Sequence, residues 1–229
     1  MKRTESPELL DTDAGTAAEI ATSLADLRRI NCWFGGVSTT QALVARAFAQ
    51  LQAKSLSLLE VAGGAGYVPA EVQRRLQSRG LRLEITLLDR AASHLRNGSG
   101  IPALAGDALA LPFRDNSFDL VDCNLFVHHL SPRKVVEFAN EALRVCRAAV
   151  LINDLIRHSA HLALIYAGMP LFRGRITRHD SIASVRQAYT VEEMRILLGK
   201  TRAASFELKS HYLFRMGVIA WKNSVSTGN

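Results

Sequence analysis

Apolar residues recur with two different periods along this chain of 229 residues. Short apolar runs predict strands, at residues 57–61, 83–88, 101–105, 118–124 and 148–153. Helical spacing between these runs predicts helices, at residues 68–79, 91–97 and 132–147. Strands that alternate with helices in this way are typical of a parallel sheet. Two closing runs, 205–212 and 215–222, lie too close together for a crossover helix and therefore predict an antiparallel hairpin.

This pattern divides the chain into three parts. Residues 1–15 mix charged and small polar residues without periodicity, so we expect a flexible tail. Residues 16–54 show helical spacing and predict a helical cap before the first strand. Residues 55–229 form the main domain, and an insertion at about 157–189 separates its fifth strand from the closing hairpin.

The first strand ends in an acidic residue and a turn of small residues. Glu60 and Val61 are followed by Ala62-Gly63-Gly64-Ala65-Gly66, and helical spacing resumes at Val68. Backbone N–H groups at such a helix start can face an anion, and glycines let a ligand approach the main chain. Asp89 ends the second strand 23 positions after Gly66, close to the spacing of a carboxylate that binds a ribose. The pattern indicates a nucleoside cofactor, although dinucleotide-binding and methyl-donor-binding folds share it.

Several motifs in this order resemble those of the class I S-adenosylmethionine-dependent methyltransferases, and in particular the small-molecule group that includes the ubiquinone and menaquinone methyltransferases. The resemblance extends from about residue 56 to residue 222. The motifs that carry it are Glu60 to Gly66, Asp89, Gly106-Asp107-Ala108, Leu111-Pro112-Phe113, Ser117-Phe118-Asp119 and His128-His129-Leu130. The chain departs from the family pattern at Ala62, which takes the place of a glycine; if the backbone there needs φ > 0, alanine costs on the order of 1 kcal/mol.

The resemblance implies an α/β fold, a seven-stranded, mostly parallel Rossmann-like sheet with an antiparallel C-terminal hairpin and an N-terminal helical cap. It also implies S-adenosylmethionine as the cofactor. The residues expected to bind this donor are Glu60, Ala62, Gly63, Gly64, Gly66, Asp89, Arg90, Asp107, Ala108, Asn124 and Leu125. Glu60 would lie near the methionine end, Asp89 would bind the ribose, Arg90 would cover the adenine and Asp107 would accept from its amino group. The alternative for each of the three acids is a cap or turn carboxylate.

His128 and His129 follow the fourth strand, where an open α/β sheet has its crevice. A neutral imidazole within hydrogen-bond reach could take the proton of a phenol, so both are candidate bases, with a slight preference for His129. The alternative is that one of the two only fastens the loop. Two histidines without carboxylate or cysteine ligands at suitable spacing are poor evidence for a metal, so no metal site is expected.

The C-terminal part of the chain carries the positive charge. Residues 131–229 contain fifteen Lys and Arg against seven Asp and Glu, and arginines flank the apolar segment 162–172. This insertion is either a buried helix with solvated arginines at its ends or a lid over an apolar substrate that carries an acidic group. In a variant of the second interpretation, the substrate rests on an anionic membrane surface. Nucleic-acid binding is less favoured, because no aromatic residues are interleaved with the arginines. Candidate substrate residues are Asp154, Arg157, Tyr166, His179 and Arg186.

The chain has no uncharged apolar run of 18 residues and no signal-peptide core, which favours a cytoplasmic location. Its three cysteines form no CxxC pair and are expected to be reduced thiols. The resemblance therefore implies methyl transfer to a small, largely apolar and phenolic oxygen acceptor. The alternatives are methylation of a ring carbon, a catalytically inactive subunit that binds the donor or serves in assembly, and a nicotinamide-dependent dehydrogenase. The oligomeric state stays open.

Overall fold

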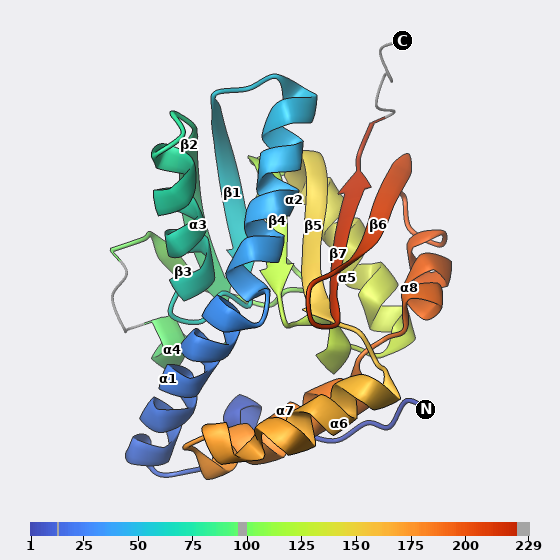
Figure 1. Ribbon diagram of the computed structural model, residues 1–229. Coiled ribbons are helices and arrows are strands. Elements are labelled where there is room, and N and C mark those ends of the chain that lie inside the picture. Colours follow the sequence, from blue (N-terminus) through green and yellow to red (C-terminus); the bar gives the residue numbers. More distant parts are fainter. Residues whose placement is uncertain (13, 96–99, 224–229) are drawn as a thin grey trace.

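The computed structural model describes residues 1–12, 14–95 and 100–223 and contains one seven-stranded sheet in the order β3-β2-β1-β4-β5-β7-β6 (Figure 1). The strands are β1 (Ser55–Val61), β2 (Arg82–Asp89), β3 (Ala103–Ala105), β4 (Phe118–Asn124), β5 (Cys146–Leu155), β6 (Ser205–His211) and β7 (Arg215–Trp221). Strands β1 to β5 pair in parallel, whereas β7 is antiparallel to both β5 and β6. The predicted fold class is confirmed, including the antiparallel hairpin.

Helices cover both faces of the sheet and its carboxyl edge (Figure 1). They are α1 (Ala17–Trp33), α2 (Gly36–Leu51), α3 (Tyr67–Gln77), α4 (Ala92–Leu95), α5 (Pro132–Val145), α6 (Ser159–Gly168), α7 (Arg175–Gln187) and α8 (Val191–Leu198), with 3-10 turns η1 (Leu10–Thr12), η2 (Val127–His129) and η3 (Met169–Leu171). The predicted helix 91–97 is α4 as far as Leu95; residues 96 and 97 lie outside the described residues. None of the described helices is long and apolar enough to cross a membrane.

Two apolar cores, one on each face of the sheet, lie between the strands and the helices that cover them. Leu58 of β1 packs in the core formed with α2 and α3, whereas its neighbour Leu59 packs in the core formed with α5 and α8. Successive side chains of a strand point to opposite faces, so a strand covered on both sides reads as a continuous apolar run. This is why the central strands were visible in the sequence as unbroken hydrophobic stretches.

The insertion after β5 lies across the edge of the sheet at which the parallel strands end. Helices α6 and α7 run below the tips of β4 and β5 in Figure 1, and α7 also packs against α1. Asp26 of α1 fastens the loop before α7, because its Oδ2 accepts hydrogen bonds from the backbone N–H groups of Arg173 and Gly174, both at 2.9 Å. The insertion therefore covers the edge at which a cofactor site is expected.

The N-terminal segment, residues 1–12, differs from the expected flexible tail. The backbone N–H groups of Leu9 and Leu10 donate to the carboxylate of Asp180 in α7, at 2.8 and 3.0 Å. Arg3 donates to the carbonyl oxygens of Gln187, His128 and Leu130. These partners lie more than 120 positions away along the chain, so the lack of local periodicity in the segment gave no indication of them.

Candidate functional site

The turn after β1 contains three small residues in the left-handed region of backbone conformation. Ala62, Gly64 and Gly66 have φ values of 56°, 49° and 72°. A Cβ at Gly63 would come within 2.8 Å of Glu60 Cγ, whereas one at Gly64 would meet nothing within 4 Å. Ala62 therefore does adopt a positive φ, at a cost on the order of 1 kcal/mol, and the space beside Gly64 is open.

Asp89 joins the end of β2 to this turn. Its Oδ2 accepts from the backbone N–H of Gly64 at 2.8 Å, and its Oδ1 accepts from the backbone N–H of Ala91 at 2.9 Å. An ionised carboxylate offers about four lone-pair sites, so each oxygen can still accept one more hydrogen bond. Asp89 thus acts as a cap for the loop after β2 and remains able to bind a ribose.

A buried acidic pair lies beside the turn. Glu60 of β1 and Asp122 of β4 are direct neighbours in the register of the two strands, and Asn124 Nδ2 donates to Glu60 Oε1 at 2.8 Å and to Asp122 Oδ2 at 3.1 Å. Burial raises the pKa of both carboxyl groups, and the charge of Glu60 raises the pKa of Asp122 further. Among the described residues, Glu60 Oε2 and Asp122 Oδ1 have no hydrogen-bond partner.

The sequence analysis did not find Asp122 or the groups that orient Asn124. Thr40 of α2 donates its hydroxyl to Asn124 Oδ1 at 2.6 Å, and Asn153 Nδ2 donates to Thr40 Oγ1 at 3.0 Å. The only available signal for Asp122 was an acid inside an apolar strand, where an ionised group is costly unless it is paired. The residues of this cluster come from α2, β1, β4 and β5.

Replacing Asp122 with asparagine is expected to stabilise the ligand-free protein at neutral pH. The pKa of Asp122 is higher in the folded protein than the value of about 3.9 expected in the unfolded protein. The protonated carboxyl group therefore contributes fully to stability below about pH 3.9, and this contribution is lost as pH rises through the folded-state pKa. An amide does not ionise, so Asp122→Asn should gain at least about 1 kcal/mol, the cost of roughly one pKa unit.

Thermal unfolding between pH 5 and pH 8 measures this gain, with Asp119→Asn as a control of opposite sign. Burial raises the pKa of Asp119, but hydrogen bonds from Ser57 and Arg147 outweigh burial and lower this pKa. The Asp119→Asn variant should therefore lose stability at neutral pH. Equal destabilisation of both variants would contradict the interpretation that ionisation of Asp122 destabilises the folded protein.

The other predicted donor residues lie along the same edge but differ in exposure. Arg90 and Asp107 are exposed, and Ala108, Asn124 and Leu125 are half-buried. Asp107 Oδ1 accepts from the backbone N–H of Leu109 at 2.9 Å, which is the contact of a turn aspartate. Leu125 has φ 51° and its N–H donates to Asn153 O.

His128 is buried, with 2% of its surface exposed, and lies between two carboxylates. Its Nδ1 is 2.6 Å from Asp154 Oδ1, its backbone N–H donates to Asp154 Oδ2 at 3.1 Å, and its Nε2 is 3.4 Å from Glu8 Oε1. Burial lowers the pKa of this imidazole, but Asp154 and Glu8 outweigh burial and raise it to about 10. This environment favours a positioning role over that of a free base.

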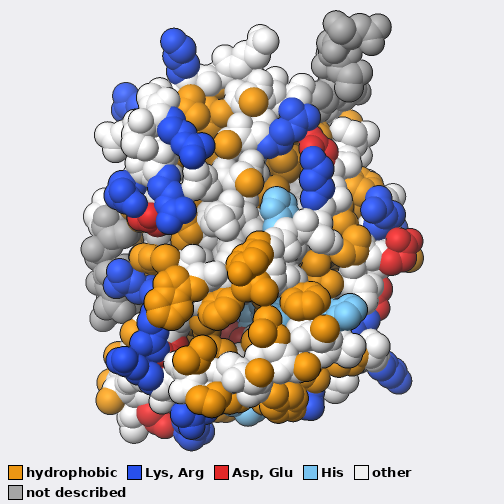
Figure 2. Space-filling view, in the orientation of Figure 1, with side chains coloured by type: hydrophobic (Ala, Val, Ile, Leu, Met, Phe, Trp, Pro, Cys, Tyr) orange, Lys and Arg blue, Asp and Glu red, His pale blue; other side chains and the backbone are white. Residues whose placement is uncertain are grey.

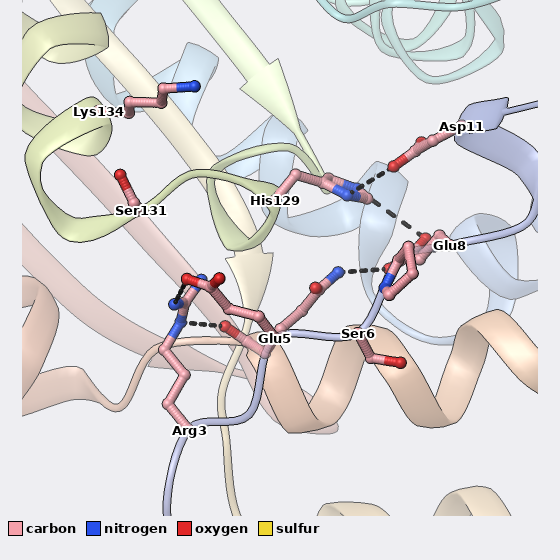
Figure 3. A pocket seen from close by; sticks show the side chains of 10 residues that line it. Arg3, Glu5, Ser6, Glu8, Asp11, His129, Ser131 and Lys134 are labelled. Carbon is pink, nitrogen blue, oxygen red and sulfur yellow. Dashed lines mark hydrogen bonds and ion pairs between the residues drawn. The ribbon is translucent and has the colours of Figure 1, made fainter.

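His129 is more accessible, with 22% of its side chain exposed. Its Nδ1 is 2.9 Å from Asp11 Oδ2, and it lines a pocket of about 420 Å³ between the N-terminal segment and the start of α5 (Figure 3). The pocket is lined by Arg3, Glu5, Ser6, Pro7, Glu8, Asp11, His129, Ser131, Lys134 and Gln187. None of the predicted donor residues lines it, so this pocket is not the donor site.

The five predicted substrate residues are not brought together. Asp154 holds His128, and Arg157 is buried, with its guanidinium donating to Ala188 O at 2.7 Å and to Glu193 Oε1 at 2.6 Å. Arg186 donates to the hydroxyl of Tyr166 at 3.3 Å on the exposed side of α6 and α7. His179 pairs with Asp180 at 2.9 Å. Arg157 therefore fastens the base of the insertion, and only Tyr166 and Arg186 form a joint surface.

Comparison with known proteins supports the methyltransferase family that the sequence resembles. Residues 59–152 match a family model described as "Methyltransferase domain". No curated protein matches this sequence.

Several solved structures share the fold at low sequence identity. A methyltransferase from Aquifex aeolicus has a TM-score of 0.56 at 14% identity, covering 81% of this chain and 93% of its own. The plantazolicin methyltransferase BamL, in complex with a desmethylPZN analog and SAH, has a TM-score of 0.63 at 15% identity and 89% coverage of both chains. An O-methyltransferase family 2 protein from Planctomyces limnophilus, in complex with apigenin, has a TM-score of 0.54 at 16% identity, covering 73% and 50%.

The residues at the strand ends fit S-adenosylmethionine. A cationic ligand suits a site beside two buried carboxyl groups, and the open space at Gly64 leaves room beside Asp89. Glu60 and Asp122 would face the positive end of the donor, and Asp89 would hold its ribose. The sheet order, the strand-end acids and the matched domain together support a class I S-adenosylmethionine-dependent methyltransferase.

Proposed function

We propose that the enzyme methylates an oxygen of a small, largely apolar, phenolic acceptor, in secondary or quinone-like metabolism. The observation that carries this proposal is the partly exposed His129 in the turn η2 after β4, whose imidazole is paired with Asp11 of the N-terminal segment. A phenol must lose its proton as its oxygen is methylated, and an imidazole with an orienting carboxylate is a suitable acceptor for that proton.

Bound S-adenosylmethionine supplies a methyl group that its sulfonium already makes electrophilic. The protein must align the acceptor, exclude water and take the proton. His129 would take the proton, Asp11 would hold the imidazole, and His128 would position the loop through its contacts with Asp154. Methylation of a ring carbon is the alternative within the class, and a donor-binding subunit without activity is the alternative from another class.

The insertion suits an apolar acceptor. Hydrophobic side chains gather across the lower half of the face shown in Figure 2, where α1, α6 and α7 lie in Figure 1. Exposed apolar residues of this region include Tyr166 at 48% and Leu171 at 65%. Arg186 beside Tyr166 would pair with an acidic group on the acceptor. The same arginines and apolar residues would also suit peripheral contact with an anionic membrane.

The apigenin complex of the Planctomyces limnophilus protein supports a phenolic acceptor, because apigenin is itself a phenol. The decisive experiment is a screen of phenols, quinol-like compounds and aryl carboxylates with an isotope-labelled donor. Mass spectra of the products distinguish an ether from a ring-methylated carbon by fragmentation. An ether is the expected product; a ring-methylated product would contradict the oxygen assignment, and donor binding without any turnover would favour the inactive subunit.

The lid role of the insertion predicts a specific change in hydrogen exchange. Residues 160–186 should exchange more slowly when an acceptor-like ligand is added to the complex with S-adenosylhomocysteine, whereas residues 60–66 should respond mainly to the donor product. Exchange measured on the free enzyme, the binary complex and the ternary complex separates the two effects. Identical protection of residues 160–186 in the binary and ternary complexes would contradict the lid.

A further inference from the structure

The His128-His129 pair lies beside a third potential ligand that the methyl-transfer proposal does not use. Glu8 of the N-terminal segment reaches the pair: its Oε1 is 3.4 Å from His128 Nε2, and its Oε2 is 3.9 Å from His129 Nε2 (Figure 3 shows Glu8 and His129). His128 Nε2 is fully buried and has no hydrogen-bond partner among the described residues. At 3.4 Å from Glu8 Oε1, this nitrogen forms an ion pair but no hydrogen bond, so a ligand could take the place of its proton.

The spacing of the three groups fits a small metal ion. One ligand atom from each of Glu8, His128 and His129 can be chosen so that all lie within 4.8 Å of one another. In a tetrahedral site with bonds of about 2.0–2.1 Å, ligand atoms are about 3.4 Å apart. Glu8 Oε1 and His128 Nε2 are separated by this distance, and the other carboxylate oxygen, Oε2, is half an ångström farther than this from His129 Nε2.

Each of the three side chains also has a polar partner that fixes its orientation, as metal ligands usually do. The other ring nitrogens, Nδ1 of His128 and of His129, lie 2.6 Å from Asp154 and 2.9 Å from Asp11. Glu8 Oε1 accepts from Ser184 Oγ at 2.5 Å and from Gln187 Nε2 at 2.8 Å, which holds the carboxylate beside the two imidazoles. A carboxylate on the far nitrogen of a histidine fixes its tautomer and turns the near nitrogen toward a metal.

We propose that Glu8, His128 and His129 bind a divalent transition-metal ion, with zinc as the ion that suits two imidazoles and one carboxylate best. Three protein ligands leave a fourth position open, as in catalytic zinc sites. Glu8 and His129 line the pocket of Figure 3, so the ion can enter from solvent through it. The ion would link the N-terminal segment to the loop after β4.

This site changes one assignment of the proposed function. A metal-bound His129 has no free lone pair for the acceptor, and a phenol bound at the open position would instead lose its proton to water because the ion lowers its pKa. Metal binding is measured without donor or acceptor, so its failure would leave the methyl-transfer proposal intact.

The test uses the full-length protein after chelator treatment, titrated calorimetrically with Zn²⁺ and, separately, with Mg²⁺. We expect one Zn²⁺ per chain, no comparable binding of Mg²⁺, and slower hydrogen exchange in residues 1–12 of the zinc form. Glu8→Gln and His129→Ala should each weaken zinc binding at least about 10-fold. Glu5→Gln is the matched control, because Glu5 lies in the same segment and lines the same pocket but pairs with Arg3.

Cobalt gives an independent readout, since Co²⁺ in a four-coordinate site absorbs more strongly in the visible range than hydrated Co²⁺. The strong absorption should appear with the wild-type protein and Glu5→Gln and be absent from His129→Ala. Absence of stoichiometric zinc binding, or zinc binding that both ligand variants leave unchanged, would overturn the proposal. In either case the space between Glu8 and His128 holds only an ion pair with a protonated imidazole.

Discussion

Asp89→Ala is expected to weaken binding of S-adenosylhomocysteine by about 10- to 150-fold. The variant loses an acceptor for two ribose hydroxyls, and hydrogen bonds to a charged group contribute about 1.5–3 kcal/mol. It also releases the backbone N–H of Gly64, which Asp89 now holds at 2.8 Å. Both effects act on the donor site, so isothermal calorimetry of the ligand measures their sum.

A matched control is available at the opposite edge of the sheet. Asp119 of β4 also accepts a backbone hydrogen bond through its carboxylate, from Ser57 N at 2.8 Å, but it lies at the amino end of the strand. Asp119→Ala should therefore cost stability without changing donor affinity. Unchanged affinity in Asp89→Ala, or an equal loss in both variants, would contradict the role of Asp89 as ribose ligand.

His129→Ala is expected to slow turnover by about 10²- to 10⁴-fold with nearly unchanged donor affinity, because general-base catalysis contributes in this range. If the imidazole is the base, higher pH should partly restore the rate by ionising the phenol in solution. The measurement is a pH–rate profile of the wild-type protein and the variant, combined with calorimetry of S-adenosylhomocysteine. A wild-type rate in His129→Ala would exclude this residue from the chemistry.

His179→Ala is the informative companion variant. His179 also pairs with an aspartate, Asp180, at 2.9 Å, but it belongs to α7 and not to the loop after β4. We expect His179→Ala to retain turnover. Removal of metal from the wild-type enzyme separates base from ligand: if chelation reproduces the loss seen in His129→Ala, the imidazole acts through the metal ion.

The sequence predicted the sheet well because the evidence for it is local. The alternation of apolar runs with helical spacing marks the strands and helices within windows of a few residues, and the short connection between β6 and β7 excludes a parallel crossover. The sequence left the conformation of Ala62 open, and the structure gives this residue a φ of 56°. The first cofactor residues follow from the same local rules.

The arrangement of the site depended on contacts that no local pattern records. Asp122 meets Glu60 only because β1 and β4 are neighbours in one register, although the residues are 62 positions apart. Glu8 and Asp11 meet the two histidines across more than 110 positions, through a segment whose composition resembles a flexible tail. No carboxylate lies at a suitable spacing from His128 and His129 in the sequence, whereas the fold brings Glu8 close to both.

The sequence by itself thus determined the class of fold, because hydrophobic period and connection length act within short stretches of chain, and the resemblance of its motifs pointed to the donor. Tertiary structure alone decided which acids are buried side by side, which histidine is buried and which carboxylates lie beside the two histidines. Those properties depend on burial and on charges only a few ångströms away, and folding brings these together from distant parts of the chain.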